Sequence, residues 1–449
     1  MTSCTRSRVR RGAAAGALLV LVLLGLAGCE GDTQEKAAGG AARPFEGKSL
    51  TLITANHPWA DEIKPLLPAF EEATGMSVLI QSHFEDQLTQ KLTVQFTSGA
   101  EKPDVFMYRP LQEGKYFYRS GWLQPLDDYA NRDAGYGLDD FSAQAIRSAT
   151  VDGKLAGIPV ITEQGILYYR KDLLEKAGLR VPQTIGELTE AARRLHDPEH
   201  GMYGFVARGQ RSPLVTQVSS FLYSEGGDFI VDGRAAINSP QALKAFTSYG
   251  TLLREYGPPG VIHMSWPQAS RLFASGQAAF YIDANSIYRS VLDPAQSQVE
   301  DSVGYAPFPA GDAGPKTYSI TSWGLAMNPK TPDPEAAWAF IAWATSRETV
   351  LHTQQKGNPG ARRSVWAHPE GTKGFPAELV QAIQGSIRDG VDHDRPATSD
   401  VAGAREAVGE IVQRIMSGET DIGQTADRAN AALQAIIDKE AGMKAGMKP

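Results

Sequence analysis

The sequence predicts an α/β fold made of two similar units, and three observations indicate it. From Leu50 onward, short apolar strands alternate with amphipathic helices, which is typical of a parallel sheet covered by helices. The same alternation begins again after residues 157–159. The chain has 449 residues, which is too many for a single hydrophobic core. We therefore expect two α/β units joined near residue 158.

The expected elements of the first unit follow one another without long gaps. Strands are predicted at residues 50–53, 78–80 and 103–107, and helices at residues 61–74 and 85–98. Gly75 marks the end of the first helix because glycine readily takes the left-handed conformation of a helix C-terminus. In parallel sheets ligands bind at the carboxyl ends of the strands. The side chains that follow these strands are therefore candidate ligand contacts: His57, Trp59, Tyr108, Arg109 and Glu113.

The second unit begins with a strand over residues 165–169 and a short helix over residues 171–177. Thr184 and Glu187 are three residues apart in a capping box, which predicts the start of a helix that runs to Leu195. Later strands are expected at residues 279–282, 303–306 and 324–327, and later helices at residues 334–346, 404–416 and 425–440.

The N-terminus predicts export and lipid anchoring. Four arginines precede an apolar run over residues 12–24 that is too short to span a bilayer permanently, so residues 1–28 are predicted to be a cleavable signal peptide. The closing residues LAGC resemble the lipobox of bacterial lipoproteins, which implies acyl chains on Cys29 and a cell-membrane anchor on the extracytoplasmic face. Residues 29–44 are polar and rich in Ala and Gly, as in a flexible tether. Cys4 would leave with the signal peptide, which excludes a disulfide or a cysteine nucleophile.

Charge and motifs exclude several classes of function. Loss of residues 1–28, which carry four arginines and no acid, changes the net charge from −7 to −11 and argues against a nucleic-acid partner. The chain has no dinucleotide or phosphate-loop fingerprint, so no cofactor is expected. His196 and His200 are four apart, but Pro198 between them opposes the helix that would align both on a metal ion. We therefore expect no metal site.

Five strings in order resemble the bacterial extracellular solute-binding proteins (family 1), the carbohydrate and polyol receptors of ABC importers. They are GIPVITEQGILYYRKDLLEKAGLRVPQTIGEL, FASGQAAFYIDAN, VGYAPFPAG, SWGLAMNPKTPDPEAAWAFIAWATS and GNPGARRSV. The resemblance implies a two-lobe periplasmic-binding-protein-like fold of type II, with the ligand in a cleft between lobes joined by hinge crossovers. The first lobe is then expected to comprise residues 45–158 with 285–330, and the second residues 159–284 with 331–449.

The resemblance also implies a function and further contact residues. The protein is expected to capture a sugar or polyol and deliver it to an ABC permease, without catalysing a reaction. Within the matching strings, the expected ligand contacts are Glu163, Asp283, Asn285, Trp323, Gly227, Asp228 and Arg362, and a looser match covers Arg208 and Arg211. Asp-Ala-Asn at residues 283–285, where many sugar receptors have Gly and Trp, favours polyols or small sugars.

Two alternatives remain open at the level of sequence. Glu163 and Asp283 could serve a surface glycoside hydrolase if they flanked a glycosidic bond at the required separation. The same fold could also bind a solute that is not a carbohydrate, since Tyr168 and Tyr169 resemble the paired tyrosines of ferric-ion receptors.

Overall fold

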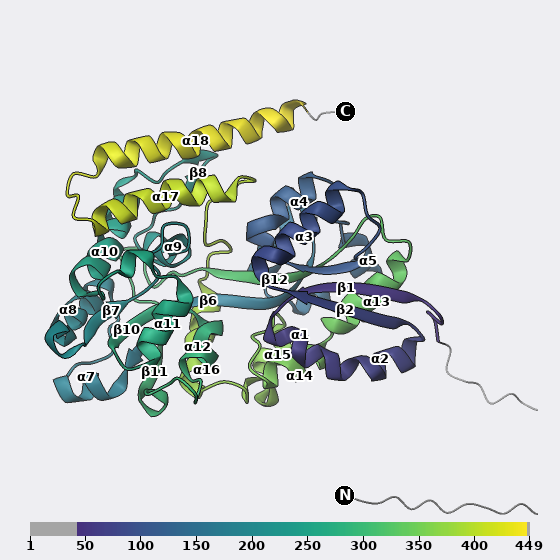
Figure 1. The fold of residues 1–449 in the computed structure, drawn as a ribbon, viewed down its shortest axis with the longest axis horizontal. Coiled ribbons are helices and arrows are strands. Elements are labelled where there is room, and N and C mark those ends of the chain that lie inside the picture. The colour runs from purple at the N-terminus through teal and green to yellow at the C-terminus, as the bar shows by residue number, and fades with distance from the viewer. Residues whose placement is uncertain (1–42, 447–449) are drawn as a thin grey trace, which may run out of the picture. The chain divides into compact units, whose positions relative to one another are not determined.

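The computed structural model describes residues 43–446, so the predicted signal peptide and Cys29 lie outside the described residues. One long sheet with helices on its faces forms the centre of the molecule (Figure 1). Neighbouring strands follow the order β2, β1, β3, β12, β6, β10 and β7, and β11 also pairs with β6. The strands are β1 (Ser49–Ala55), β2 (Ser77–His83), β3 (Val105–Tyr108), β6 (Ile158–Arg170), β7 (Tyr203–Val206), β10 (Ala278–Ala284), β11 (Val303–Pro307) and β12 (Ser319–Met327).

The N-terminal part forms the predicted parallel sheet, with β1 paired in parallel to β2 and β3. The prediction of one continuous helix over residues 61–74 is wrong. The chain instead forms α1 (Pro58–Ile63), a short 3-10 turn η1 (Lys64–Leu66) and α2 (Leu67–Thr74). Pro65 and Pro68 explain the breaks, because proline lacks the N–H that a helix interior needs but fits the first helical positions.

The C-terminal half of β6 continues the same sheet into the second predicted unit, where β10 pairs antiparallel with β6 and parallel with β7. The predicted helix start is confirmed, since the Thr184 hydroxyl accepts a hydrogen bond from the Glu187 amide at 3.1 Å and caps α8 (Ile185–Leu195). The Glu187 carboxylate accepts from the amide of Gln183, at 2.7 Å, where a full capping box would use the amide of Thr184.

Within residues 43–446, buried apolar side chains form three clusters. We call the elements of the first cluster the first lobe and those of the other two clusters the second lobe. Helices of the first lobe include α3 (Glu85–Thr97), α4 (Lys115–Arg119), α6 (Ala143–Ser148) and α13 (Pro334–Ala344). Helices of the second lobe include α8, α9 (Leu214–Ser224), α10 (Pro240–Tyr256), α11 (Trp266–Ala274), α12 (Tyr288–Val291), α16 (Ala377–Arg388), α17 (Val401–Met416) and α18 (Gly423–Gly446). Among the residues that the structure describes, no helix is both long and apolar enough to cross a bilayer.

The clusters differ from the predicted division of the chain at two segments. Phe340 of α13 is buried in the first cluster, although the sequence division put residues 331–449 in the second lobe. Tyr305 of β11 is buried in the third cluster, although residues 285–330 were assigned to the first lobe. Both segments are predominantly apolar, and their sequence patterns do not indicate which of two neighbouring cores they cover.

Strand β6 joins the two lobes because its two halves belong to different ladders. Residues 158–164 pair antiparallel with β12, whereas residues 165–170 pair with β10 and β11. Directly before β6, a Cβ added to Gly157 would lie 2.6 Å from the Tyr108 hydroxyl, so only glycine lets the chain approach that ring. The middle of β6 is therefore held from both lobes.

An ion cluster links α4 of the first lobe to α18 of the second. Glu440 Oε1 lies 2.5 Å from Lys115 Nζ and 2.6 Å from Arg119 Nη1, and Glu440 Oε2 accepts from the amide of Ser399 at 2.7 Å. Burial alone would raise the pKa of Glu440, but Lys115 and the other donors lower it below its usual value. In Figure 1, α18 runs along the edge of the second lobe, and its C-terminal end carries this cluster.

We expect Gly165→Ala to destabilise the fold, because an added Cβ would stand 2.5 Å from Thr317 Oγ1 and 2.8 Å from Ser220 Oγ. Overpacking of this kind costs about 1–3 kcal/mol. The matched control is Gly442→Ala in α18, where a Cβ meets nothing within 4 Å and alanine stabilises a helix by about 0.5–1 kcal/mol. The midpoints of urea unfolding curves for the wild type and the two variants measure these differences in stability. An unchanged midpoint for Gly165→Ala would contradict the close contact.

Candidate functional site

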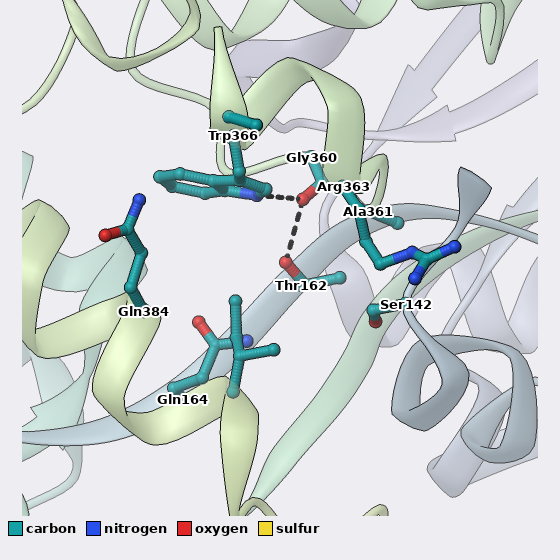
Figure 2. A pocket seen from close by; sticks show the side chains of 10 residues that line it. Ser142, Thr162, Gln164, Gly360, Ala361, Arg363, Trp366 and Gln384 are labelled. Carbon is teal, nitrogen blue, oxygen red and sulfur yellow. Dashed lines mark hydrogen bonds between the residues drawn. The ribbon is translucent and has the colours of Figure 1, made fainter.

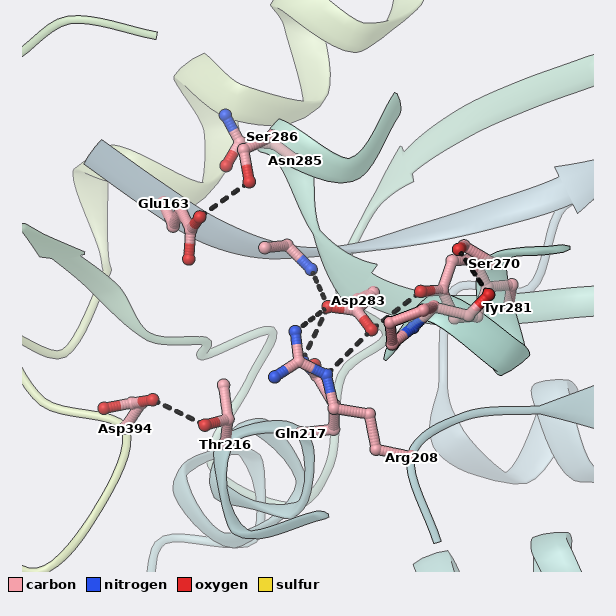
Figure 3. A network of polar contacts seen from close by, with 12 residues as sticks. Glu163, Arg208, Thr216, Gln217, Ser270, Tyr281, Asp283, Asn285, Ser286 and Asp394 are labelled. Carbon is pink, nitrogen blue, oxygen red and sulfur yellow. Dashed lines mark hydrogen bonds and ion pairs between the residues drawn. The ribbon is translucent and has the colours of Figure 1, made fainter. Parts of the chain in front are cut away.

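Glu163 lies near the middle of β6, where the strand passes from one lobe to the other (Figure 3). The side chain is half-buried, and its Oε1 accepts a hydrogen bond from Ser286 Oγ at 2.6 Å. Burial raises the pKa of Glu163, and the Ser286 hydroxyl and the charge of Arg208 offset part of that rise. The carboxylate is thus kept where its charged form is disfavoured, as at many binding and catalytic sites.

Asp283 is fully buried at the end of β10 and fixes a guanidinium beside it. Arg208 donates to both carboxylate oxygens, through Nε at 3.0 Å and through Nη2. Three further donors complete the shell: Gln217 Nε2 at 2.9 Å, the Tyr281 hydroxyl at 2.7 Å and the Ala284 amide at 2.7 Å. Burial would lower the pKa of Arg208, but the Asp283 charge raises it overall, so the guanidinium stays charged.

The remaining guanidinium nitrogen of Arg208, Nη1, makes no hydrogen bond within the described residues. Figure 3 shows it turned away from Asp283, toward the side on which Glu163 and Asp394 lie. Asp283 thus orients a donor that remains available to a solute.

A second buried ion pair faces the same region. Asp394 accepts from Arg395 through both Nε and Nη2 at 2.6 Å and from Thr216 Oγ1 at 2.7 Å. Burial alone would raise the pKa of Asp394, but the charge and donors of Arg395 lower it to about 2. Arg395 Nη1 also donates to Gln112 Oε1 at 2.6 Å, in the π-helical turn η2 (Pro110–Gly114) next to α4. This contact joins the second lobe to the chain of the first.

Among the residues that the structure describes, three buried polar atoms beside these ion pairs have no hydrogen-bond partner within 3.5 Å: Gln217 Oε1, the Tyr318 hydroxyl and Asn285 Nδ2, although the Tyr318 hydroxyl lies near the Gln217 side chain. Gln217 donates to Asp283, and burial raises the pKa of Tyr318, which the Asp283 and Glu163 carboxylates raise further. Asn285 Oδ1 accepts from the amide of Gln164 at 2.8 Å, which leaves only its amide nitrogen unpaired. Buried polar groups without partners are rare, so both unpaired donors and unpaired acceptors mark this region for a polar solute.

His57, Trp323 and Arg109 gather on the first-lobe side. The rings of His57 and Trp323 are 6.1 Å apart, and the Arg109 guanidinium carbon is 5.7 Å from the Trp323 ring centroid. A register shift of β12 between Thr321 and Trp323 re-aims the indole, as bulges commonly do. Glu113 holds Arg109 in place by accepting from its amide at 2.8 Å and from its Nε at 2.9 Å.

His57 is a neutral cap of helix α1. Its Nδ1 accepts from the Trp59 amide at 3.1 Å, so the ring proton is on Nε2. Burial lowers the pKa of His57 to about 4, although the Asp61 carboxylate opposes the shift.

Trp59 and Tyr108 are core residues of the first lobe, 2% and 1% exposed. Tyr108 packs on Gly157 and Gly324, where an added Cβ would lie 2.6 Å and 3.1 Å from its ring. Neither side chain therefore reaches the polar group around Arg208 and Glu163 in this arrangement.

Arg362 lies at a separate place, beside residues 136–140 of the first lobe. Its guanidinium donates to the carbonyls of Thr345 at 2.7 Å, Tyr136 at 2.9 Å and Gly137 at 3.1 Å, and it stacks 4.3 Å from the Phe141 ring centroid. The side chain is 3% exposed, and these bonds occupy its donors.

Gly227 and Asp228 lie in the turn after α9. A Cβ at Gly227 would lie 2.5 Å from the Leu222 side chain, so close packing explains why glycine occupies this position. Asp228 Oδ1 accepts from the Phe229 amide at 2.6 Å and from His393 Nε2 at 2.9 Å. Asp228 and a second carboxylate, Asp392, raise the pKa of His393 to about 9 against the effect of burial.

The arrangement favours binding over bond cleavage. Asp283 accepts five hydrogen bonds from protein donors and so has no free oxygen with which to act as a second catalytic carboxylate beside Glu163. Within residues 43–446, no three His, Cys, Asp or Glu side chains gather as a metal site would require.

Known proteins resemble this chain in sequence and in fold. The family model described as bacterial extracellular solute-binding protein matches residues 57–350. The mannitol-binding protein of Pseudomonas aeruginosa is 30% identical over 331 residues, covering 71% of this chain and 75% of that protein. The erythritol/L-threitol-binding protein of Mycolicibacterium smegmatis is 25% identical over 373 residues, covering 77% of each.

Two solved structures of ABC transporter solute-binding proteins are similar in fold. The protein from Agrobacterium radiobacter K84, in complex with ribitol, has a TM-score of 0.75 and 29% identity, covering 87% of this chain and 99% of that one. The protein from Agrobacterium vitis S4, with bound D-mannitol, has a TM-score of 0.71 and 28% identity over the same shares. The two-lobe fold predicted from the sequence is confirmed.

Glu163→Gln is expected to raise the melting temperature of the solute-free chain at pH 7–8. Because burial raises the pKa of Glu163, its contribution to stability is fully present below the ordinary value of 4.5 and is lost as the pH rises through the raised pKa. The difference between variant and wild type should therefore shrink as the pH falls toward 4.5. Thermal unfolding at several pH values measures it.

Glu440→Gln is the control, because its effect on the melting temperature should have the opposite sign. The pKa of Glu440 is lowered, so its stabilisation is present above the ordinary value and is lost as the pH falls. This variant should melt at a lower temperature than wild type at pH 7–8. A Glu163→Gln variant that also melted at a lower temperature than wild type at pH 7–8 would contradict the conclusion that the folded state disfavours the charged form of Glu163.

Proposed function

Because the chain belongs to the bacterial extracellular solute-binding protein family, we propose that it captures a linear polyol outside the cytoplasm and delivers it to an ABC import permease. The protein is a binding protein and not an enzyme. Two relatives are named for mannitol and for erythritol or L-threitol, and two similar structures hold ribitol and D-mannitol.

The observation that carries the proposal is the mixed set of unpaired polar atoms. Arg208 Nη1 and Asn285 Nδ2 can only donate, whereas Gln217 Oε1 can only accept. A hydroxyl group donates and accepts at once, so a chain of hydroxyls can satisfy all of these atoms. A carboxylate or an ammonium group would satisfy one kind and leave the other unpaired.

The aromatic surroundings favour a linear polyol over a pyranose. A sugar ring needs a free aromatic face, but Trp323 has the Arg109 guanidinium near its ring and is only 6% exposed. We therefore assign Glu163 and Arg208, which are partly exposed, as direct solute contacts. Gln217, Asn285 and Tyr318 are fully buried, so a solute reaches them only when the lobes open. Asp283 holds Arg208, and His57, Trp323, Arg109 and Glu113 form the first-lobe wall. The role of Trp59, Tyr108 and Arg362 is then structural, as is that of Gly227 and Asp228.

The first test is thermal unfolding of the chain from residue 43, with mannitol, ribitol, erythritol, glucose, maltose and glutamate each added separately. A solute at a hundredfold excess over its dissociation constant stabilises the folded state by about 2.7 kcal/mol, so a bound polyol raises the midpoint clearly. A shift with one or more polyols supports the proposal. A shift of the melting midpoint with glucose or maltose alone would indicate that the solute is a pyranose and not a linear polyol. A shift with glutamate alone would contradict both assignments.

Arg208→Lys tests the assigned contact. Lysine keeps the positive charge beside Asp283 but lacks the second nitrogen that reaches the solute. Hydrogen bonds to charged groups contribute about 1.5–3 kcal/mol, so affinity should fall at least tenfold by calorimetric titration. The control is Arg388→Lys on the exposed end of α16, which should bind as wild type does. Equal affinities of the two variants for the polyol would show that Arg208 does not contact the solute.

We also propose that two acyl chains on Cys29 hold the mature protein at the membrane, where a single chain would give only marginal binding. The motif LAGC at residues 26–29 supports this. In a bacterial host, wild type should fractionate with membranes and Cys29→Ala should not, whereas Cys4→Ala should behave like wild type. Membrane association that survives Cys29→Ala would contradict the anchor.

A further inference from the structure

A cavity of about 210 Å³ lies behind β6, separate from the polar group described above. Side chains alternate along a strand, so Thr162 and Gln164 point away from the face that carries Glu163. Both line the cavity, together with Ser142, Gly360 and Trp366 (Figure 2). Its walls come from both lobes, since Ser142 caps α6 of the first lobe, and Ile387, another lining residue, belongs to α16 of the second.

Gln164 lines this cavity and carries a buried, unpaired acceptor. The residue is 1% exposed, and its Nε2 donates to Ser319 Oγ at 3.2 Å, but its Oε1 has no partner. A buried acceptor without a donor costs about 1–3 kcal/mol. Figure 2 shows the Gln164 amide, the Gln384 side chain and the Trp366 ring around the same space. A donor on a molecule in the cavity would relieve this cost.

The rest of the lining is largely apolar, although the polar side chains of Ser142, Arg363 and Gln384 also border the cavity. Trp366 Nε1 donates to the carbonyl of Gly360 at 2.8 Å, and Thr162 Oγ1 donates to the same carbonyl at 3.1 Å. The polar edge of the indole is thereby satisfied, and Ala361, Ala367 and Ile387 contribute methyl and methylene groups. The volume exceeds the share of about 30 Å³ that one water molecule occupies in the liquid, so the cavity has room for a small organic molecule.

We propose that this cavity is a second binding site, which takes a small neutral molecule with an apolar body and one hydroxyl or N–H donor. The apolar body contacts Trp366 and Ile387, and the donor bonds Gln164 Oε1. The chemistry differs from that of the front site, where several hydroxyls meet charged side chains. An occupant contacts both lobes and the strand whose other face carries Glu163.

The probes are benzyl alcohol and benzyl methyl ether, which share an apolar ring but differ in the hydroxyl donor. Saturation-transfer NMR titrations on the chain from residue 43 measure both dissociation constants. We expect benzyl alcohol to bind about tenfold more tightly, because only it satisfies Gln164 Oε1. Gln164→Leu should abolish that preference. Equal affinities of the two probes for the wild-type chain, or no binding of either, would overturn the proposal.

A second variant locates the probe independently of Gln164. Ala367 is exposed and lines the cavity, so Ala367→Phe should fill its mouth without disturbing a buried residue, and should weaken binding of both probes at least tenfold. The matched control, Ala441→Phe, adds the same ring at an exposed position of α18. If both phenylalanine variants bind benzyl alcohol as wild type does, the probe lies elsewhere and the proposed site is wrong.

Discussion

The ladder of β6 is the constraint on which the rest of the structure depends. Because one strand pairs with β12 over residues 158–164 and with β10 and β11 beyond them, its middle can move with neither lobe alone. Strand alternation then assigns Glu163 to one face and Gln164 to the other. Gly165 permits this path, since Thr317, Ser220 and Tyr318 occupy the space of any larger side chain. The two proposed sites, which differ in chemistry, thus share one strand.

Paired charges prepare the front site. Asp283 holds Arg208, and Asp394 holds Arg395, so both guanidinium groups are oriented before a solute arrives. Such preorganisation matters because side chains that are already ordered lose little entropy on binding. Glu163 differs from both aspartates, since a serine hydroxyl and not an arginine is its hydrogen-bond partner. Burial raises the pKa of Glu163, so its charged form lowers the stability of the fold.

The alternation of strands and helices was predictable from sequence because it reflects local periodicity. The two-lobe fold and the candidates Glu163 and Asp283 came from the resemblance, and their role in binding stays a prediction. Asp394, Arg395, Gln217 and Tyr318 were not predicted. Asp394 meets Thr216 across 178 residues, and Arg395 meets Gln112 across 283, so no local pattern encodes either contact. Likewise, α13 and β11 are apolar enough for either core, and only three-dimensional packing decides between them.

Contacts between the lobes extend well beyond the solute. Arg395 reaches Gln112, and Glu440 gathers Lys115 and Arg119 at the far end of α18. Each such contact stabilises the arrangement in which the lobes meet, with or without a solute. Because apparent affinity scales with the fraction of molecules already competent to bind, these contacts contribute to capture without touching the solute. In the proposed function, opening of the lobes would have to break these same contacts, so they would oppose release of the solute as well as favour its capture.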